Sequence, residues 1–492
     1  MATTSAAEET APTFPHPHLY NDDIAPVQRD GRHWGAYNVF TMWANDVHSL
    51  GNYTFAIGLF ALGLGIWQIL LSLAIGASAL FVILTLSSFI GEQTGLPFPV
   101  VSRIALGIRG GRVSAICRGG IAIVWFGIQT YLAADVLSAL LVGLVPSWSG
   151  LMATTYLGLP ILDWYTFIAL WIIQIIIVSY GMAMIRHYIA FAGPIILITM
   201  LSMALWVFVR ADFNLAPSIS EPLTGGSMWA MIFAGACLWV VIYGTFALNV
   251  CDFTRAVGTK RAVVIGNFTG ILLNTMFFAV IVVILAGGEL YLSGKIITSP
   301  ADIVSTIAHP AWRTAAALAL IVLTIAVNLI ANFVAPNYML CDLFPRWLTF
   351  RRAGLVTAII GFIILPWNLY NSPAVIQYFL GGVGAILGPF FGLIMVDYWL
   401  IRRQKLNIPD LYSAASSGTY FYRNGFNQRA FYALLPAVVI SLIIALVPAF
   451  STISDFSWIF GAIAGGILHW LFAPKGVEYH HVEDPSLERP AQ

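Results

Sequence analysis

Long apolar segments, each close to the length needed to cross a lipid bilayer, dominate the sequence. A membrane-spanning helix takes about 20 mainly apolar residues, and only a helix or a closed barrel satisfies its own backbone groups without water. Charged residues make up 9% of the chain, against about 25% in a soluble domain. We therefore predict an all-α integral membrane protein with twelve transmembrane helices. The predicted spans are 38–63, 67–91, 115–144, 164–185, 188–209, 228–250, 263–287, 314–336, 353–368, 374–400, 429–449 and 457–473.

The distribution of lysine and arginine predicts the orientation of these spans. Twenty of the 23 basic residues fall on the side of the N-terminus, and three (Arg210, Lys295 and Arg313) fall on the other side. Because cytoplasmic loops carry an excess of Lys and Arg, both termini are predicted to be cytoplasmic. We expect a multi-pass protein of the plasma membrane.

Net charge and cysteine spacing argue against several kinds of partner. The formal net charge is +1 and no run of basic residues occurs, so no nucleic-acid partner is expected. The four cysteines show neither metal-ligand spacing nor a disulfide framework, so they indicate no metal site.

The first span is unusually polar for a membrane segment. Such a helix is costly in hydrocarbon unless it faces a cavity, and glycine-interrupted spans that line a cavity are typical of transporters. Two other interpretations stay open: Asp46 and His48 pair with each other or with a neighbour, or the stretch lies at the membrane interface. The polar residues, with the glycine among them, are Asn45, Asp46, His48, Ser49, Gly51 and Asn52.

The third span carries Trp125 and Gln129 four residues apart, so both side chains share one helix face. An indole next to a carboxamide can stack on a planar ring and hydrogen-bond its edge. The alternative is that Gln129 and the nearby Asp135 only bond a neighbouring helix.

Two later spans carry comparable features. In the sixth, Tyr243 directly precedes Gly244, and in the eighth Asn328 and Asn332 lie four residues apart as part of one polar stripe. Interruptions in the first and sixth spans, five spans apart, are the pattern of an inverted-repeat transporter with a site at the membrane midplane. Packing against neighbouring helices is the alternative for each of these residues.

Rival functional classes have less support in the sequence. An enzyme is not indicated, because the chain contains no H-E-x-x-H, G-x-S-x-G or P-loop motif. A channel would need a repeated filter sequence or rings of charge. A channel or a substrate-sensing membrane receptor remains the alternative from a different class.

Short motifs in a fixed order give the chain a family resemblance over about residues 20–474. It resembles the nucleobase:cation symporter-1 family, in its purine, pyrimidine, allantoin and hydantoin permease branch. The motifs are NDDIAP at 21–26 with Trp34 and Gly35, LPFP at 96–99, ALGIRG at 105–110, WFGIQ at 125–129, DFTR at 252–255, ANFVAP at 331–336, Gly388 and Pro389 with Asp397 and Tyr398, and DLY at 410–412.

The resemblance implies a LeuT-type core of two inverted five-helix repeats plus two extra helices. On this chain, repeat one is about 38–209, repeat two about 228–400 and the extra helices about 429–473. The transporter domain is then 34–474. It lies between a disordered cytoplasmic tail, 1–33, which shows no signal peptide, and a C-terminal cytoplasmic tail, 475–492.

The resemblance also implies the substrate and its contacts. A flat heterocycle of the uracil, cytosine, purine, allantoin or hydantoin class would be imported with a cation by alternating access. Trp125 and Tyr243 would stack on the ring, where relatives often have tryptophan at the second position. Gln129 and Asn332 would hydrogen-bond its edge, and Ser49 stands where a substrate-facing amide can occur.

The implied sodium site is incomplete here. Its carbonyl positions are Asn45 and His48 of the first span and Leu323 of the eighth, and its hydroxyl positions are Ala326 and Val327 of the eighth. The two hydroxyl ligands are absent, and a hard cation needs several oxygens. Sodium would then depend on a substitute oxygen from Thr324, Asn45 or Asp46.

Asp46 and His48 can both titrate, and such groups inside a membrane commonly relay protons. We therefore expect proton-coupled uptake, with sodium-coupled uptake of a related heterocyclic vitamin or ureide as the alternative. No cofactor is expected beyond the co-transported cation. The expected partners are the small-molecule substrate, that cation and the lipid bilayer, and the oligomeric state is left open.

Overall fold

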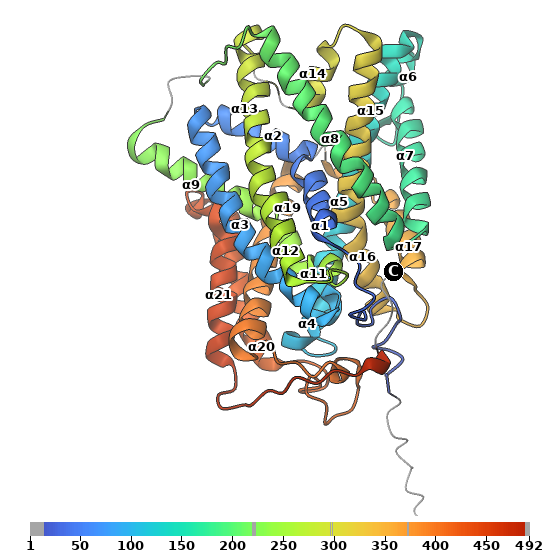
Figure 1. Ribbon diagram of the computed structural model, residues 1–492, viewed down its shortest axis with the longest axis vertical. Coiled ribbons are helices and arrows are strands. Elements are labelled where there is room, and N and C mark those ends of the chain that lie inside the picture. Colours follow the sequence, from blue (N-terminus) through green and yellow to red (C-terminus); the bar gives the residue numbers. More distant parts are fainter. Residues whose placement is uncertain (1–13, 219–222, 296, 298, 371–372, 488–492) are drawn as a thin grey trace, which may run out of the picture.

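The computed structural model describes residues 14–218, 223–295, 297, 299–370 and 373–487 as a bundle in which most of the long helices run along the vertical direction of Figure 1, while several others lie across it. The α-helices are α1 Ala36–Val47, α2 Leu50–Ala61, α3 Ile66–Thr94, α4 Phe98–Leu106, α5 Gly111–Leu144, α6 Ser149–Ala153, α7 Ile161–Ser179, α8 Met182–Arg210, α9 Gly225–Ile242, α10 Gly244–Asn249, α11 Cys251–Thr254, α12 Lys260–Asn267, α13 Asn274–Ser293, α14 Pro300–Thr306, α15 Pro310–Asn328, α16 Val334–Leu343, α17 Phe350–Ile363, α18 Pro366–Tyr370, α19 Pro373–Val396, α20 Gln428–Leu446 and α21 Ser457–Phe472.

Shorter elements complete the chain. Three π-helical segments interrupt long helices: η2 Phe268–Leu273, η3 Leu329–Phe333 and η4 Asp397–Ile401. Two-residue strands, β1 Thr155–Tyr156 and β2 Leu159–Pro160, pair antiparallel. Single 3₁₀ turns are η1 Pro146–Trp148, η5 Pro409–Tyr412, η6 Pro448–Phe450, η7 Ser454–Phe456 and η8 Pro485–Leu487.

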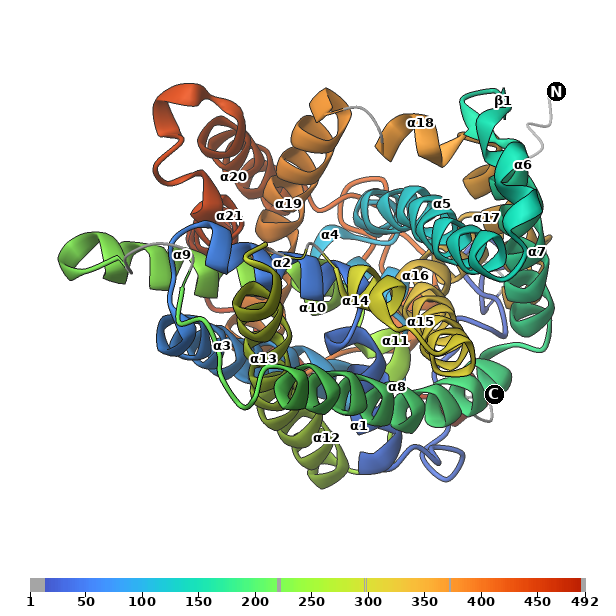
Figure 2. The same cartoon turned by 90° about the horizontal axis from the view of Figure 1, so that it is seen from above.

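The predicted all-α membrane fold is confirmed. Within the described residues, ten helices are long and apolar enough to cross a membrane. The other two predicted spans correspond to the pair α1 and α2, of 12 residues each, and to α17, of 14 residues. Seen from above, α20 and α21 pack against α19 at the edge of the bundle, and α10 lies near its centre (Figure 2).

The first span is broken, but not at its glycine. α1 ends at Val47 and α2 begins at Leu50, with the extended backbone of Ser49 (φ −60°, ψ 149°) between them. The Ser49 hydroxyl caps α2 by accepting from the Asn52 amide at 3.3 Å. The Asn52 carboxamide donates to the freed carbonyls of Asp46 and Val47 at 2.9 and 3.2 Å. The break therefore depends on a serine and an asparagine, whereas Gly51 lies inside α2.

The sixth span is broken at Tyr243, between α9 and α10. Gly244 is required there because a Cβ atom would lie 2.5 Å from the Trp458 indole nitrogen of α21. The eighth span is continuous through α15, η3 and α16, with Asn328 as the last residue of α15 and Asn332 within η3.

The two ends of the chain pack on one end of the bundle, which we name the terminal face and which is the lower end in Figure 1. The Asn21 carboxamide donates to the Pro345 and Leu348 carbonyls at 2.7 and 2.9 Å, and the Trp34 amide donates to Ala256 at 2.9 Å. Residues 14–33 are therefore ordered against the bundle, contrary to the predicted disordered tail. Residues 1–13 of that tail lie outside the described residues.

The C-terminal segment also crosses the terminal face. The Ile408 amide donates to the Val482 carbonyl at 2.9 Å, and Glu483 pairs with Arg29 at 3.2 Å and with His481 at 3.0 Å. Burial raises the pKa of the Glu483 carboxyl, but the hydrogen bonds from His481 and Arg29 outweigh it and hold that pKa below its usual value. The N-terminal and C-terminal segments are thus joined to each other as well as to the bundle.

Candidate functional site

Trp125 and Gln129 lie one turn apart on α5 and are both half-buried. Among the described residues, neither side chain has a hydrogen-bond partner. A carboxamide in that state remains available to a ligand, and the indole beside it offers a flat apolar face. The pair is therefore available to stack on a ring and bond its edge, and its contact with a substrate stays a prediction.

Asn328 and Asn332 bring the eighth span to the same turn of α5. The Asn328 carboxamide donates to the Phe126 carbonyl at 3.1 Å, and Phe126 packs edge-on against Phe333 with ring centroids 4.7 Å apart. The Asn332 amide group donates to the Asn328 oxygen at 3.0 Å. The predicted substrate contacts on α5 and η3 therefore lie on helices that pack against each other, at the turn of α5 that contains Phe126.

Tyr243 lies at the break of the sixth span with its hydroxyl among groups of the first span. The hydroxyl accepts from the Asn52 carboxamide at 3.1 Å and donates to the Asp46 carboxylate. Its ring packs against Trp43 and Trp239, with centroids 6.0 and 5.4 Å away. The structure therefore joins Tyr243 to Asp46, which the sequence had assigned to substrate and cation separately.

Arg118 is a functional candidate that the sequence analysis missed. It had been counted among the basic residues of the cytoplasmic side, yet it is buried in α5 seven residues before Trp125. The guanidinium donates to the Thr245 carbonyl at 3.1 Å, to the Asn249 oxygen at 3.0 Å and to the Ala331 carbonyl at 2.9 Å. These bonds join α5, α10 and η3 between the Trp125 level and the terminal face. An arginine inside a predicted span was the available signal.

The side chains proposed for cation coupling are mostly occupied by contacts inside the protein. The Asn45 carboxamide donates to the Thr41 and Ile189 carbonyls at 2.7 and 2.9 Å. The two ring nitrogens of His48 contact the Tyr53 hydroxyl at 2.7 Å and the Asn274 oxygen at 3.2 Å. The proposed pairing of Asp46 with His48 is therefore replaced by separate neighbours for each.

The eighth-span positions of the implied sodium site, Leu323, Ala326 and Val327, are buried side chains without an oxygen atom. The nearby Thr324 hydroxyl donates to the Leu320 carbonyl of its own helix at 2.8 Å. Ser49 serves as the α2 cap described above. Among the described residues, no cluster of three or more His, Cys, Asp or Glu side chains could hold a metal ion.

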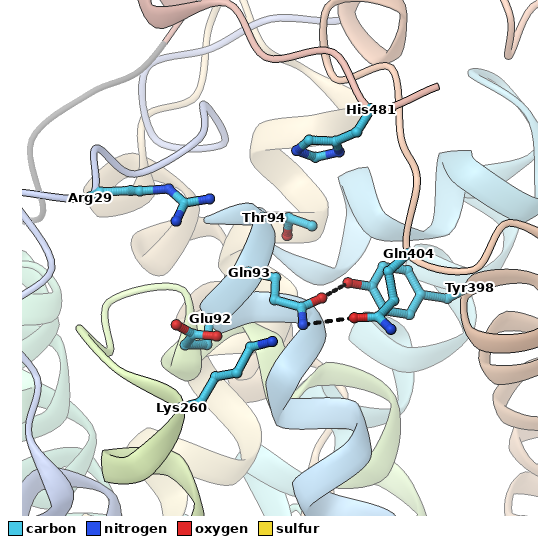
Figure 3. Close-up of a pocket in the computed structure, with 8 residues that line it drawn as sticks. All are labelled: Arg29, Glu92, Gln93, Thr94, Lys260, Tyr398, Gln404 and His481. Carbon is cyan, nitrogen blue, oxygen red and sulfur yellow. Dashed lines mark hydrogen bonds between the residues drawn. The ribbon is translucent and has the colours of Figure 1, made fainter. Parts of the chain in front are cut away.

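A polar cavity of about 260 Å³ opens at the terminal face, away from these residues (Figure 3). The Gln93 amide group donates to the Gln404 oxygen at 2.9 Å, and the Tyr398 hydroxyl donates to Gln93. These bonds join the end of α3 to η4 and the loop that follows it. The residues that line the cavity are Arg29, Glu92, Gln93, Thr94, Lys260, Tyr398, Gln404 and His481.

The family described as permeases for cytosine/purines, uracil, thiamine and allantoin matches residues 26–471. The chain belongs to this family, the nucleobase:cation symporter-1 permeases. It is a membrane permease and not an enzyme. It is 32% identical to an allantoin permease of Bacillus subtilis, over 90% of this chain and 91% of that protein. It is 30% identical to a purine-uracil permease of Arabidopsis thaliana, over 93% of this chain and 78% of that protein.

Solved structures show the same fold. The closed, bromovinylhydantoin-bound form of the nucleobase-cation-symport-1 transporter Mhp1 matches with a TM-score of 0.75 and 23% identity, over 92% of this chain and 95% of that one. The inward-facing form of Mhp1 matches with a TM-score of 0.70 and 22% identity, over 92% of this chain and 93% of that one. The predicted LeuT-type architecture of two inverted five-helix repeats with two further helices is therefore confirmed.

Proposed function

We propose that this permease imports a flat nitrogenous heterocycle, of the nucleobase, allantoin or hydantoin class, by alternating access. The observation that carries the proposal is the half-buried pair Trp125 and Gln129, whose side chains have no hydrogen-bond partner among the described residues. The Asn328 bond to the Phe126 carbonyl brings Asn332 close to this turn of α5. Tyr243 would contribute the second aromatic face and Ser49 a polar edge. The names of the relatives, which include permeases for allantoin, purines and uracil, support this class of substrate.

We further propose that protons drive the uptake. Ala326 and Val327 provide no hydroxyl ligand for sodium, and the Thr324 hydroxyl is bonded within its helix. Asp46 is a buried titratable group at the break of α1, and its bond to Tyr243 connects it directly to the proposed substrate site. Protonation of Asp46 would weaken its hold on the Tyr243 hydroxyl and so couple the proton to the ring.

The transporter domain is proposed to span 34–474 in the plasma membrane, with the terminal face toward the cytoplasm. Repeat one is placed at about 38–209, repeat two at about 228–400 and the extra helices at about 429–473. The excess of Lys and Arg on the side of the termini supports this orientation.

The deciding experiment is uptake of labelled heterocycles into proteoliposomes, with proton and sodium gradients imposed separately. Accumulation of one ring class under an inward proton gradient alone is the expected result. Accumulation that needs sodium would overturn the proton assignment and leave the ring assignment in place. Equilibration without accumulation would indicate a channel, and binding without any flux would indicate a receptor.

A further inference from the structure

A chain of buried amides runs through the protein behind Asn332. It begins at Gln174 on α7, passes Thr130 on α5 and Asn328 on α15, and ends at Asn332 on η3. Gln174 and Asn328 are each 1% exposed, Thr130 is 0% exposed and Asn332 is 6% exposed. The Asn328 amide group lies 2.7 Å from the Gln174 oxygen and 3.0 Å from the Thr130 hydroxyl oxygen.

Backbone carbonyls fix the direction of every bond in this chain. The Gln174 amide group donates to the Leu170 carbonyl at 3.2 Å, and the Asn328 amide group donates to the Phe126 carbonyl at 3.1 Å. A carbonyl oxygen can only accept, so neither carboxamide can be turned over without losing these bonds. The oxygen of Gln174 must then face Asn328, and the oxygen of Asn328 must face Asn332.

Thr130 reinforces the same direction. Its hydroxyl donates to the Phe126 carbonyl at 2.8 Å, which leaves only acceptor lone pairs toward the amides. The Gln174 amide group donates to that oxygen at 3.1 Å. All four side chains therefore agree on one arrangement, and turning any one of them over would leave buried polar atoms without partners.

We propose that Gln174, Thr130 and Asn328 are positioning residues that hold Asn332 with its carboxamide oxygen toward the substrate. The Asn332 amide group is bound to Asn328, and among the described residues the Asn332 oxygen has no partner. The site then requires an unsubstituted N–H at the ring edge that meets Asn332, as in a lactam, imide or ureide ring. This inference rests on the proposed function and specifies which edge of the ring is recognised.

The test uses one transported ring and its single N-methyl isomers, with affinity measured by competition against labelled uptake. Replacing one N–H by N-methyl is expected to weaken wild-type binding by about a hundredfold at a single ring position, because the Asn332 oxygen is then left without a donor. Asn328→Leu removes the acceptor for Asn332 and is expected to reduce that discrimination at least about tenfold. Discrimination at the other ring positions should stay unchanged.

Substitution of Gln174 tests the proposal more strictly, because Gln174 is separated from the substrate by Asn328 and Asn332 in the hydrogen-bonded chain. Gln174→Met keeps the shape and removes both polar atoms, so it should relax the selectivity at the same ring position about tenfold. Gln174→Glu in its protonated form keeps an oxygen toward Asn328 and a donor toward the Leu170 carbonyl, and it should restore discrimination at the pH where the acid is neutral. Ser138→Ala is the matched control, because it removes a buried bond of 2.9 Å to Thr166 between the same two helices, α5 and α7.

The possible outcomes separate the two proposals. Wild-type protein that transports the ring and every N-methyl isomer equally would overturn the assigned orientation of Asn332 and leave the proposed function standing. Equal losses for all isomers in Gln174→Met and Ser138→Ala would show a structural role and also overturn it. Failure of the wild type to bind any heterocycle would instead overturn the proposed function.

Discussion

The polar groups on α5 and η3 differ from those on α1 in how their hydrogen bonds are used. Trp125 and Gln129 have no partner among the described residues, whereas both ring nitrogens of His48 contact neighbouring helices and the Asn45 amide group is bonded, so that only the Asn45 carboxamide oxygen lacks a partner. Polar side chains inside a membrane are costly in either case. The comparison shows that a polar side chain in a membrane span can be either structural or ligand-binding. The two kinds are distinguished by how many of their hydrogen-bonding groups are left without a partner in the protein.

Arg118 bonds α5 to α10 and η3, and its removal is expected to have the largest effect. Its three bonds come from a charged donor, and such bonds contribute about 1.5–3 kcal/mol each. Arg118→Met should therefore lower the initial uptake rate more than about tenfold and expose Cys251, which is buried two residues after Asn249 in the chain, to a membrane-impermeant thiol reagent. Arg210→Met, at a half-exposed ion pair of 3.5 Å with Glu289, is the control. Uptake and labelling as in the wild type would contradict this role.

Asp46 accepts a hydrogen bond from Tyr243 of the proposed substrate site, and we expect it to carry the coupling. Asp46→Asn should abolish accumulation under an inward proton gradient and leave exchange of internal for external substrate intact. In the wild type, uptake should rise as the external pH falls, because protonation from outside is the driving step. Asp163→Asn, at a buried carboxylate of α7, is the matched control. Proton-driven accumulation by the Asp46→Asn variant would contradict the proposed role of Asp46 in proton coupling.

Gln129 tests whether the free carboxamide of α5 bonds the ring edge. Gln129→Ala should raise KM by about tenfold for rings with polar edges, which corresponds to one lost hydrogen bond of about 1.4 kcal/mol. Apolar ring analogues should be bound as before, as measured by competition with the transported substrate. An equal loss for both kinds of ring would assign Gln129 to helix packing.

His48 should show the smallest effect on transport. His48→Gln removes at least one buried hydrogen bond and is expected to destabilise the protein by about 1 kcal/mol. The accumulation ratio under a proton gradient should stay within about twofold of the wild type, since both ring nitrogens already contact Tyr53 and Asn274. Thermal unfolding and uptake measured on one preparation would separate the two effects. Loss of proton-driven accumulation in His48→Gln would instead assign His48 a role in proton coupling.

The sequence predicted the spans, the two interrupted helices and the faces of α5 and η3, because these follow from hydropathy and from residues spaced one turn apart. It placed the first interruption at Gly51, although Ser49 and Asn52 create it through side-chain capping. Capping depends on where the backbone leaves the helix, and composition does not report that position.

Residues whose partners come from other helices were missed. Arg118 and Gln174 sit in apolar runs, and their partners on α10, η3 and α15 depend on how each helix is rotated in the bundle. Residues 14–33 were misjudged for a related reason, because Asn21 bonds to carbonyl groups that leave no pattern in the sequence. Rotation and backbone contacts are three-dimensional facts that one sequence does not contain.

The most direct test of the central claim is the equilibrium affinity of the transported ring for Trp125→Ala, with Trp125→Phe and His48→Gln measured beside it. We predict that Trp125→Ala loses about 1–3 kcal/mol of binding, or about 5–150-fold in Kd, by analogy with aromatic stacking on a base. Trp125→Phe should recover most of that loss, and His48→Gln should bind nearly as the wild type does. Unchanged affinity in Trp125→Ala, or a greater loss in His48→Gln, would contradict the assignment of the ring to the α5 and η3 face.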